Sequence, residues 1–286
     1  MNLRESALPA GWYPRNPHDI SRFLEKFPQK SPAAAAAAIA PHAGWFFSGA
    51  IAAAAVSSLD PDAETVLVLG GHLPGGYLPL FAEEDGAKTP LGNMMIDAPL
   101  RELLQKDIPH REDLYRDNTV EVLLPMVRFF FPKARLLWLR LPAEEASFEA
   151  GRIIARSASA LGRKVVVLGS TDLTHYGANY GFSPMGSGAP ALKWVREQND
   201  RAFIEAVERG NPGEVLERAE RDKSACSVGA ALGALGFAQA RAAGAGPARL
   251  LAYGTSVDAL REAEEGDAEA VDSFVGYAAM VMGNGQ

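Results

Sequence analysis

Three of the five histidines in this sequence directly follow runs of small or branched apolar residues. His42 comes two residues after an alanine-rich run, His72 follows residues 65–71, and His175 lies a few residues beyond residues 164–169. α/β proteins place their chemistry where a buried strand ends and the next element begins. If these strands are parallel neighbours, the three imidazoles meet at one edge of a sheet and could bind a metal or transfer protons.

The single cysteine, Cys226, is a candidate third metal ligand. It precedes an alanine- and glycine-rich run that we expect to be a buried helix, and a thiol at a helix N-terminus ionises more easily. Together, His42, His72 and a Cys226 thiolate would hold a transition metal and leave positions open for a substrate. Taken singly, each has a plainer interpretation, because strand-end histidines are often structural and buried cysteines often act as small apolar side chains.

Asp172 and His175 suggest acid–base chemistry beside this site. They are three residues apart, so a helical turn would place them on one side. A carboxylate next to an imidazole fixes its tautomer and raises its basicity, and we expect these two to act as the catalytic pair. The alternative is that Asp172 caps a turn.

Other polar and aromatic residues have two interpretations each. Glu121 interrupts an otherwise apolar helical segment, where it is either solvated or faces the site. Trp45 follows the His42 turn, where it either packs on the next helix or forms a wall of the pocket. Trp12 lies in a turn-rich opening segment and is either a packing anchor or a pocket residue.

Buried strands alternate with helical segments along the chain, which predicts an α/β fold with a central, mostly parallel sheet flanked by helices. The run at residues 33–40 is alanine-rich, but prolines on both sides favour a strand over a helix. Nothing resembles an interdomain linker, so residues 1–286 are expected to form a single domain. The expected strands are 33–40, 65–70, 135–141, 164–169, 250–254 and 274–281.

The composition excludes some functions and favours a location. A net charge of -7 argues against nucleic acid or an anionic membrane as partner. One cysteine cannot form an internal disulfide, and the opening residues lack a signal-peptide pattern, so we expect a cytoplasmic protein. The uncharged run at 225–240 is shorter than the roughly 20 residues of a membrane span and is interpreted as a buried helix.

The order of several short motifs resembles the Memo family, whose prokaryotic members are called AmmeMemoRadiSam system protein B. The resemblance extends over nearly the whole chain. Its motifs are Ala10-Gly11-Trp12-Tyr13, Pro41-His42-Ala43-Gly44 with Ser48-Gly49, Gly70-Gly71-His72, Thr119-Val120-Glu121 with Leu124-Pro125, Ser170-Thr171-Asp172 with His175, Cys226, Tyr253-Gly254-Thr255-Ser256 and Val275-Gly276-Tyr277-Ala278-Ala279.

The resemblance implies a fold similar to that of the class III extradiol dioxygenases, which hold non-haem Fe(II). It implies a pocket in which His42, His72 and Cys226 hold Fe(II) or, alternatively, copper, with zinc a weaker candidate. Asp172 and His175 would lie beside the metal, and Trp12 matches a pocket aromatic. The resemblance also implies a functional link to AMMECR1-like and radical SAM proteins, and adaptor activity in the animal member.

The sequence departs from the family pattern around the pocket. The usual Glu-His-Ser is Asp117-Asn118-Thr119, so Asn118 takes the place of a pocket histidine and is expected to contact the substrate. Ser227 follows Cys226 in place of a glycine, and Gly70-Gly71 replaces Pro-Ser or Pro-Asn. A downstream His-Pro is absent.

Three functional hypotheses follow. The first is an iron- or copper-dependent, dioxygenase-like redox enzyme acting on a small aromatic or hydroxylated substrate. A metal-dependent hydrolase with the same ligands is a variant. The third is a non-catalytic module that uses the pocket to hold a peptide or partner protein, and loss of a pocket histidine favours it.

Overall fold

Four parallel strands form the centre of the main sheet in the computed structural model, which describes residues 1–29, 35–115, 117–241, 247–263 and 272–283. In spatial order they are β2 (Ala37–Ala40), β9 (Val165–Ser170), β3 (Thr65–Leu73) and β8 (Arg135–Pro142). Their side chains are almost all buried, which explains why the sequence shows continuous apolar runs instead of alternation. The predicted parallel sheet is this central part.

The alanine-rich run before His42 is a strand, as predicted, although alanine favours helices. All four residues of β2 are buried between layers. Their small side chains let helices pack closely on both faces, so tertiary packing overrides the local preference. Residues 33 and 34 of the predicted strand lie outside the described residues.

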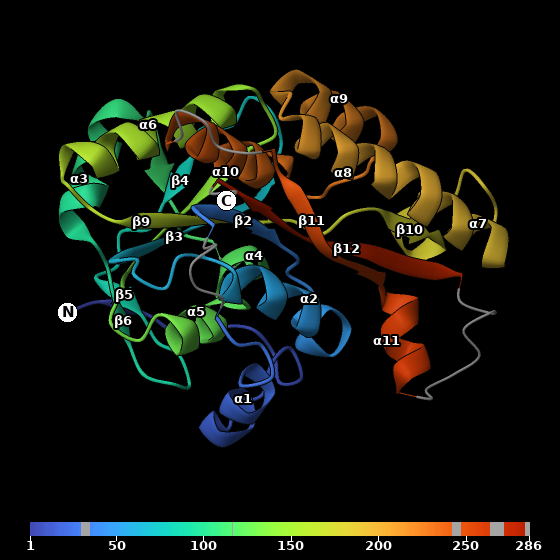
Figure 1. Cartoon of the computed structure of the whole chain (residues 1–286), viewed down its shortest axis with the longest axis horizontal. Helices are drawn as coiled ribbons and strands as arrows, with labels where there is room; N and C mark the ends of the chain where they lie inside the picture. The colour runs from blue at the N-terminus through green and yellow to red at the C-terminus, as the bar shows by residue number, and fades with distance from the viewer. Residues whose placement is uncertain (30–34, 116, 242–246, 264–271, 284–286) are drawn as a thin grey trace.

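Antiparallel strands extend the sheet on both sides, so the whole sheet is mixed (Figure 1). On one side β12 (Ser273–Met282) pairs with β2, and both β10 (His175–Gly177) and β11 (Arg249–Thr255) pair with β12. On the other side β4 (Leu80–Phe81) pairs with β8 and β7 (Arg111–Glu112) pairs with β4. A small separate sheet contains β1 (Leu3–Arg4), β5 (Gly86–Ala87) and β6 (Met94–Met95).

Helices cover both faces of the sheet. The helices are α1 (Pro17–Leu24), α2 (Trp45–Ser57), α3 (Ala98–Asp107), α4 (Asn118–Glu121), α5 (Leu124–Phe130), α6 (Ala146–Ala160), α7 (Gly188–Trp194), α8 (Asp200–Arg209), α9 (Pro212–Asp222), α10 (Val228–Arg241) and α11 (Ser256–Glu262), with a 3-10 turn at Ala178–Tyr180 and a π-helical turn at Val195–Asn199. In Figure 1, α10 and α6 lie on one face, and α2 and α5 lie on the other. Across the described ranges, none of the helices combines the length and apolar character needed to span a membrane.

Helices α6 and α10 touch almost backbone to backbone. A Cβ on Gly151 of α6 would lie 2.0 Å from the Gly233 carbonyl oxygen of α10, and one on Gly236 of α10 would lie 2.0 Å from the Phe148 carbonyl oxygen of α6. Glycine is therefore required on both sides of this contact. The contact fixes α10, and with it the segment just before α10, against the sheet.

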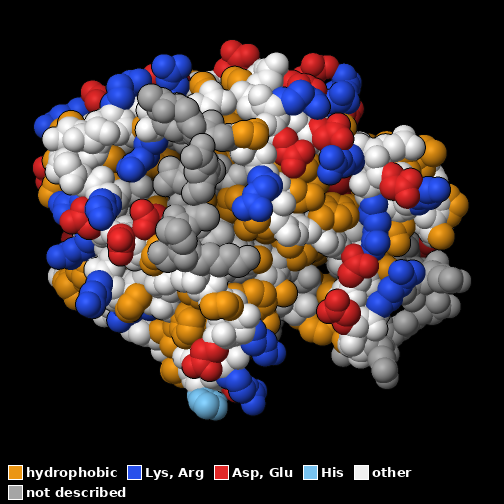
Figure 2. Space-filling model, in the orientation of Figure 1, with side chains coloured by type: hydrophobic (Ala, Val, Ile, Leu, Met, Phe, Trp, Pro, Cys, Tyr) orange, Lys and Arg blue, Asp and Glu red, His pale blue; other side chains and the backbone are white. Residues whose placement is uncertain are grey.

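Charged side chains of both signs alternate over the face shown in Figure 2. Many belong to ion pairs, such as that between Arg209 and Glu214 at 2.6 Å. The charges on this face are thus of mixed sign.

Candidate metal centre

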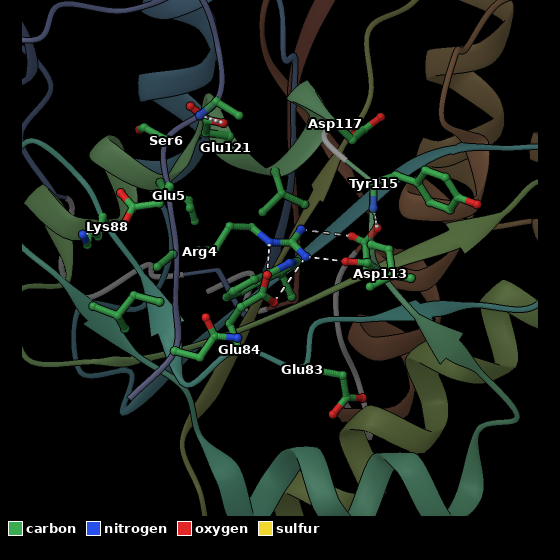
Figure 3. Close-up of a pocket in the computed structure, with 18 of the residues that line it drawn as sticks. Arg4, Glu5, Ser6, Glu83, Glu84, Lys88, Asp113, Tyr115, Asp117 and Glu121 are labelled. Atoms are coloured by element: carbon green, nitrogen blue, oxygen red, sulfur yellow. Dashed lines mark hydrogen bonds and ion pairs between the residues drawn. The ribbon is translucent and has the colours of Figure 1, made fainter.

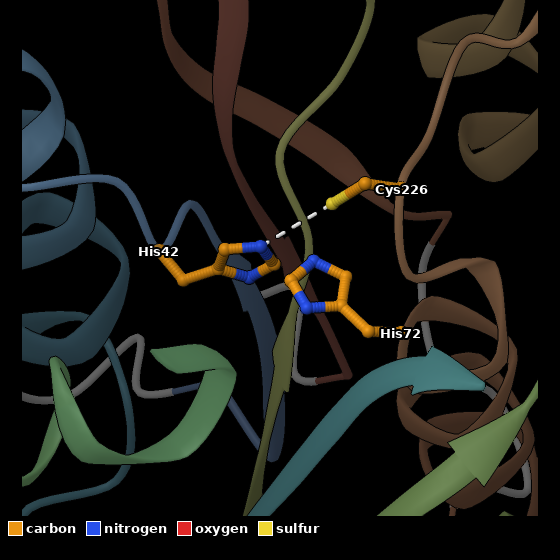
Figure 4. A group of neighbouring side chains, drawn as sticks. All are labelled: His42, His72 and Cys226. Carbon is orange, nitrogen blue, oxygen red and sulfur yellow. Dashed lines mark hydrogen bonds between the residues drawn. The ribbon is translucent and has the colours of Figure 1, made fainter. Parts of the chain in front are cut away.

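Three predicted ligands from distant parts of the chain meet at the carboxyl edge of the central strands. His42 follows β2, His72 ends β3, and Cys226 lies two residues before α10. One donor atom from each lies within 4.8 Å of the others, and Figure 4 shows the two rings and the sulfur facing one another. The convergence expected from the strand ends is confirmed for His42 and His72, with Cys226 beside them, whereas His175 is not part of this cluster.

His42 is buried, and both of its ring nitrogens have partners. Nδ1 lies 2.9 Å from the Ser170 hydroxyl at the end of β9, and Nε2 lies 3.3 Å from Cys226 Sγ. The register of β2 and β9 places Ser170 beside Ala40 and so within reach of the ring. The Ser170 contact therefore directs Nε2 toward the sulfur.

His72 is held by its backbone and by its ring. Its φ of 59° lies in the left-handed region, which is uncommon for a residue other than glycine and costs of order 1 kcal/mol or more. Its N–H donates to Ser227 Oγ at 3.2 Å, and its Nδ1 lies 3.1 Å from Asp117 Oδ2. With Nδ1 occupied, Nε2 is the nitrogen left for the cluster.

Asp117 was not predicted as a site residue. Its side chain caps α4 by accepting a hydrogen bond from the Thr119 N–H at 2.8 Å, and its second oxygen contacts both His72 and Arg140. The sequence signal that could have identified it is an aspartate immediately before a helix that carries family motif residues. Its contact with His72 spans 45 residues and has no local signature.

Cys226 has the character of a thiolate. Burial raises the pKa of its thiol, but His42 and then His72 outweigh burial and hold the pKa well below its usual range. Two imidazoles account for this lowering, whereas the sequence suggested the dipole of the following helix. Cys226 is also anchored, because its N–H donates to the Asp172 carbonyl oxygen at 3.2 Å.

The two histidines have raised pKa values for a related reason. Burial lowers the pKa of His42, but Asp172 and Cys226 outweigh it. Burial also lowers the pKa of His72, and hydrogen bonds to Asp117 and Cys226 outweigh it and raise the pKa to about 10. The shifts are reciprocal, because positive charge on the imidazoles favours the Cys226 thiolate and the thiolate favours positive charge on the imidazoles.

Asp172 contacts His42. Its Oδ1 accepts a hydrogen bond from the His42 N–H at 2.7 Å, and its Oδ2 lies 3.8 Å from His42 Nε2. Burial raises the pKa of Asp172 more than His42 lowers it. The predicted hydrogen bond to His175 is not among the described contacts of this carboxylate.

His175 lies in a different local structure from the predicted helical turn. The chain is irregular up to Thr174 and enters strand β10 at His175, so Asp172 and His175 do not share a helical face. The backbone of Leu173 and Thr174 bonds to Gly276 of β12 at 2.8 and 3.0 Å, and the buried Asp200 carboxylate accepts a hydrogen bond from the Thr174 N–H at 3.1 Å. The His175 Nδ1 lies 3.2 Å from the Leu173 carbonyl oxygen.

The two tryptophans expected near the substrate have structural contacts. Trp45 is buried, and its indole N–H donates to the Val122 carbonyl oxygen at 3.0 Å. Its ring packs beside Tyr13 and Phe23 with centroids 6.2 and 5.3 Å away, as the packing interpretation predicted. Trp12 accepts the Trp45 backbone N–H on its own carbonyl oxygen at 2.8 Å.

Asn118 and Glu121 also support the scaffold. Asn118 Nδ2 donates to the His42 carbonyl oxygen at 3.1 Å, so it fixes the backbone of a ligand. The Glu121 carboxylate accepts hydrogen bonds from the N–H groups of Ala7 and Leu8, at 2.8 and 3.0 Å. Glu121 thus binds the N-terminal segment, which neither sequence interpretation anticipated.

Comparison with known proteins identifies a family that matches nearly the whole chain. The sequence pattern of the family described as "Memo-like protein" matches residues 4–281. This chain belongs to that family. A MEMO1 family protein of Pyrococcus abyssi is 31% identical over 299 aligned residues, covering 98% of this chain and 99% of the relative.

Further Memo relatives align over most of their length. A MEMO1 family protein of Thermococcus onnurineus is 29% identical, covering 98% of this chain and 99% of the relative, and one of Pyrococcus furiosus is 30% identical over 86% of each. Among solved structures, an uncharacterized protein from Escherichia coli K12 covers 84% of this chain and 98% of its own, with a TM-score of 0.43 and 13% identity. That likeness is too distant to support a functional argument.

The donor set of this Memo protein fits a transition metal. A metal bonded to nitrogen at about 2.0 Å and to sulfur at about 2.3 Å separates its donors by about 3–4 Å. The 3.3 Å between His42 Nε2 and Cys226 Sγ already meets this, and the 4.8 Å limit for the cluster requires only a small rotation of a ring. Two imidazoles and a thiolate suit iron, copper or zinc and do not suit magnesium or calcium.

Proposed function

We propose that this Memo protein binds a transition metal ion through His42, His72 and Cys226. With this ion it would act as a redox enzyme on a small substrate. The supporting observation is that one donor atom each from His42, His72 and Cys226 lies within 4.8 Å of the others, with His42 buried, Cys226 partly buried and His72 exposed. The low pKa of Cys226 supports it further, because the ligating form of cysteine is the thiolate. Fe(II) or copper is the ion we propose.

Each surrounding residue has a distinct role in this proposal. Ser170 and Asp117 hold the Nδ1 atoms of His42 and His72, which leaves both Nε2 atoms for the ion. A bound iron or copper ion would supply Lewis acidity and one-electron chemistry. His175, half-buried beside the Tyr180 ring, is the residue we assign to moving a proton to or from the substrate.

The test is the metal content of protein purified without oxygen, compared between wild type and Cys226→Ser. We expect about one equivalent of iron or copper in wild type and a large loss in the variant, because a serine hydroxyl is a poor ligand for these ions. Negligible metal in both proteins would refute metal binding. Retained metal without oxygen uptake on a panel of catechols would refute only the dioxygenase activity.

A second candidate function, a peptide-binding module, is favoured by exposed aromatic side chains that follow or precede the site residues closely in the sequence. Phe46 follows His42 by four residues and is 49% exposed, and Tyr180 follows His175 by five and is 47% exposed. Tyr115, on the loop that leads to Asp117, is 67% exposed. Such side chains suit contact with a peptide or protein.

Peptide binding that persists in Cys226→Ser would separate this function from metal chemistry. Binding by wild type alone would tie both functions to one pocket. The functional link to AMMECR1-like and radical SAM proteins remains a proposal from the family resemblance.

A further inference from the structure

A line of alternating charges runs from His72 to the N-terminal strand. His72 Nδ1 lies 3.1 Å from Asp117 Oδ2, which is 3.3 Å from Arg140 Nη1. Arg140 Nη2 lies 3.0 Å from Asp113 Oδ1, and Asp113 Oδ2 lies 3.3 Å from Arg4 Nη1. Figure 3 shows Arg4 reaching Asp113 and Glu84 at the far end of this line.

The middle of this charged line is buried. The Arg140 and Asp113 side chains are 5% and 1% exposed, and Asp117 is 11% exposed. Buried charges are stable only when their partners are well placed, and removing one partner leaves another uncompensated. The planar guanidinium of Arg140 contacts both Asp113 and Asp117, and its rigid geometry fixes the position of each carboxylate.

We propose that Asp117 is a positioning residue for the metal centre, with Arg140 and Asp113 behind it as its support. Asp117 holds His72 through Nδ1, which determines both the orientation of the ring and the nitrogen that faces Cys226. A second hydrogen bond fixes Asp117 itself, because its Oδ1 caps α4. This inference rests on the proposed metal site. It adds three residues, Asp117, Arg140 and Asp113, that are not themselves ligands.

Arg4 extends the line to a cavity of about 350 Å³. Arg4, Asp113 and Asp117 all line this cavity, which lies between the N-terminal segment and the loop leading to α4 (Figure 3). Arg4 also donates to Glu84 at 2.7 Å, so part of its charge is satisfied elsewhere. We therefore expect its influence on His72 to be weaker than that of Asp117.

The test is Co(II) affinity and the Co(II) absorption spectrum of purified, metal-stripped protein. Asp117→Asn keeps the cap on α4 but loses the charge, and Asp117→Ser keeps a cap but cannot reach His72. We expect Co(II) to bind about 10–100-fold more weakly in both variants, as when a partner of a ligating histidine is removed. The thiolate-to-Co(II) charge-transfer band should persist while the d–d bands shift.

Glu112→Gln is the matched control, because Glu112 is an exposed carboxylate on the neighbouring strand β7. It should bind Co(II) as wild type does, and Arg4→Met should weaken binding less than Asp117→Asn. Wild-type affinity and d–d bands in both Asp117 variants would overturn the positioning role, even if Cys226→Ser loses the ion. Failure of wild type itself to bind Co(II) would instead overturn the metal site.

Discussion

Gly71 lies so close to Ser227 that any side chain at position 71 would overlap it, and this overlap yields a quantitative prediction. A Cβ on Gly71 would lie 2.3 Å from Ser227 Cβ, 2.4 Å from its Oγ and 2.9 Å from its Cα. Contacts below about 3 Å force a shift, and overpacking a buried position typically costs about 1–3 kcal/mol. Because the overlap involves three atoms, we expect Gly71→Ala to cost about 3 kcal/mol of unfolding free energy.

Replacing Ser227 by glycine should relieve part of the destabilisation caused by Gly71→Ala. Ser227→Gly alone loses the hydrogen bond from the His72 N–H, worth about 1 kcal/mol, and adds backbone freedom worth about 0.5–1 kcal/mol. In the double variant the 2.3 and 2.4 Å overlaps disappear and only the 2.9 Å contact with Cα remains. We expect the double variant to be more stable than the sum of the single changes by about 1–2 kcal/mol.

Urea unfolding of the metal-free proteins measures this coupling, because bound metal would add its own stabilisation. The control is Gly213→Ala in α9, where the nearest atom to the new Cβ is 3.6 Å away and alanine should not destabilise. Additivity of Gly71→Ala and Ser227→Gly within about 0.5 kcal/mol would refute the shared volume. The coupling would also explain why the chain departs from the Memo pattern at both positions together.

Three shorter predictions concern groups around the site. Burial raises the pKa of Asp200 from 3.8 to about 6, so its neutral form stabilises the fold below pH 3.8 by about 3 kcal/mol, and this is lost as pH rises through about 6. Asp200→Asn should abolish that loss in urea unfolding at pH 4 and pH 7, and an identical pH dependence would contradict it. Metal binding at pH 7 should release a proton from His72, because its pKa is about 10 and only the neutral ring binds a metal. Isothermal titration calorimetry in buffers of different ionisation enthalpy measures this release. Equal heats of metal binding in all the buffers would exclude it. Glu121→Ala should lower the free energy of unfolding by about 3 kcal/mol and expose the N-terminal segment to protease, because the carboxylate accepts hydrogen bonds from Ala7, Leu8 and Tyr13. A melting temperature and a cleavage rate equal to those of wild type would count against this role.

The sequence predicted the meeting of the ligands because that meeting depends on strand ends. His42 and His72 follow runs that were predicted to be central strands, and parallel strands bring their carboxyl ends to one edge. Even the unusual alanine strand before His42 could be inferred, since the flanking prolines left too little length for a helix. Cys226 joined them because its helix packs on the same strands.

The partners of the ligands could not be predicted, because they depend on contacts between distant segments. The pairing of Asp172 with His175 assumed a helical turn, whereas the chain there pairs with β12 and Thr174 also bonds to Asp200 of α8. The support of His72 by Asp117 likewise spans 45 residues. Spacing in the chain carries no information about such contacts, which arise only when the layers pack.

If the proposed metal site is correct, the near-contact between α6 and α10 limits which ions that site can accept. With Gly151 and Gly236 set against opposing carbonyl groups, α10 cannot slide along its axis, so the sulfur of Cys226 keeps a fixed reach from the strand ends. An arriving ion would then need only a small rotation of a ring to reach its donors, and would not have to draw distant donors together. A rigid site of this kind would select ions by their size and preferred coordination geometry. Flexible donors would instead follow the general order of affinity for divalent metals, in which copper binds more tightly than iron.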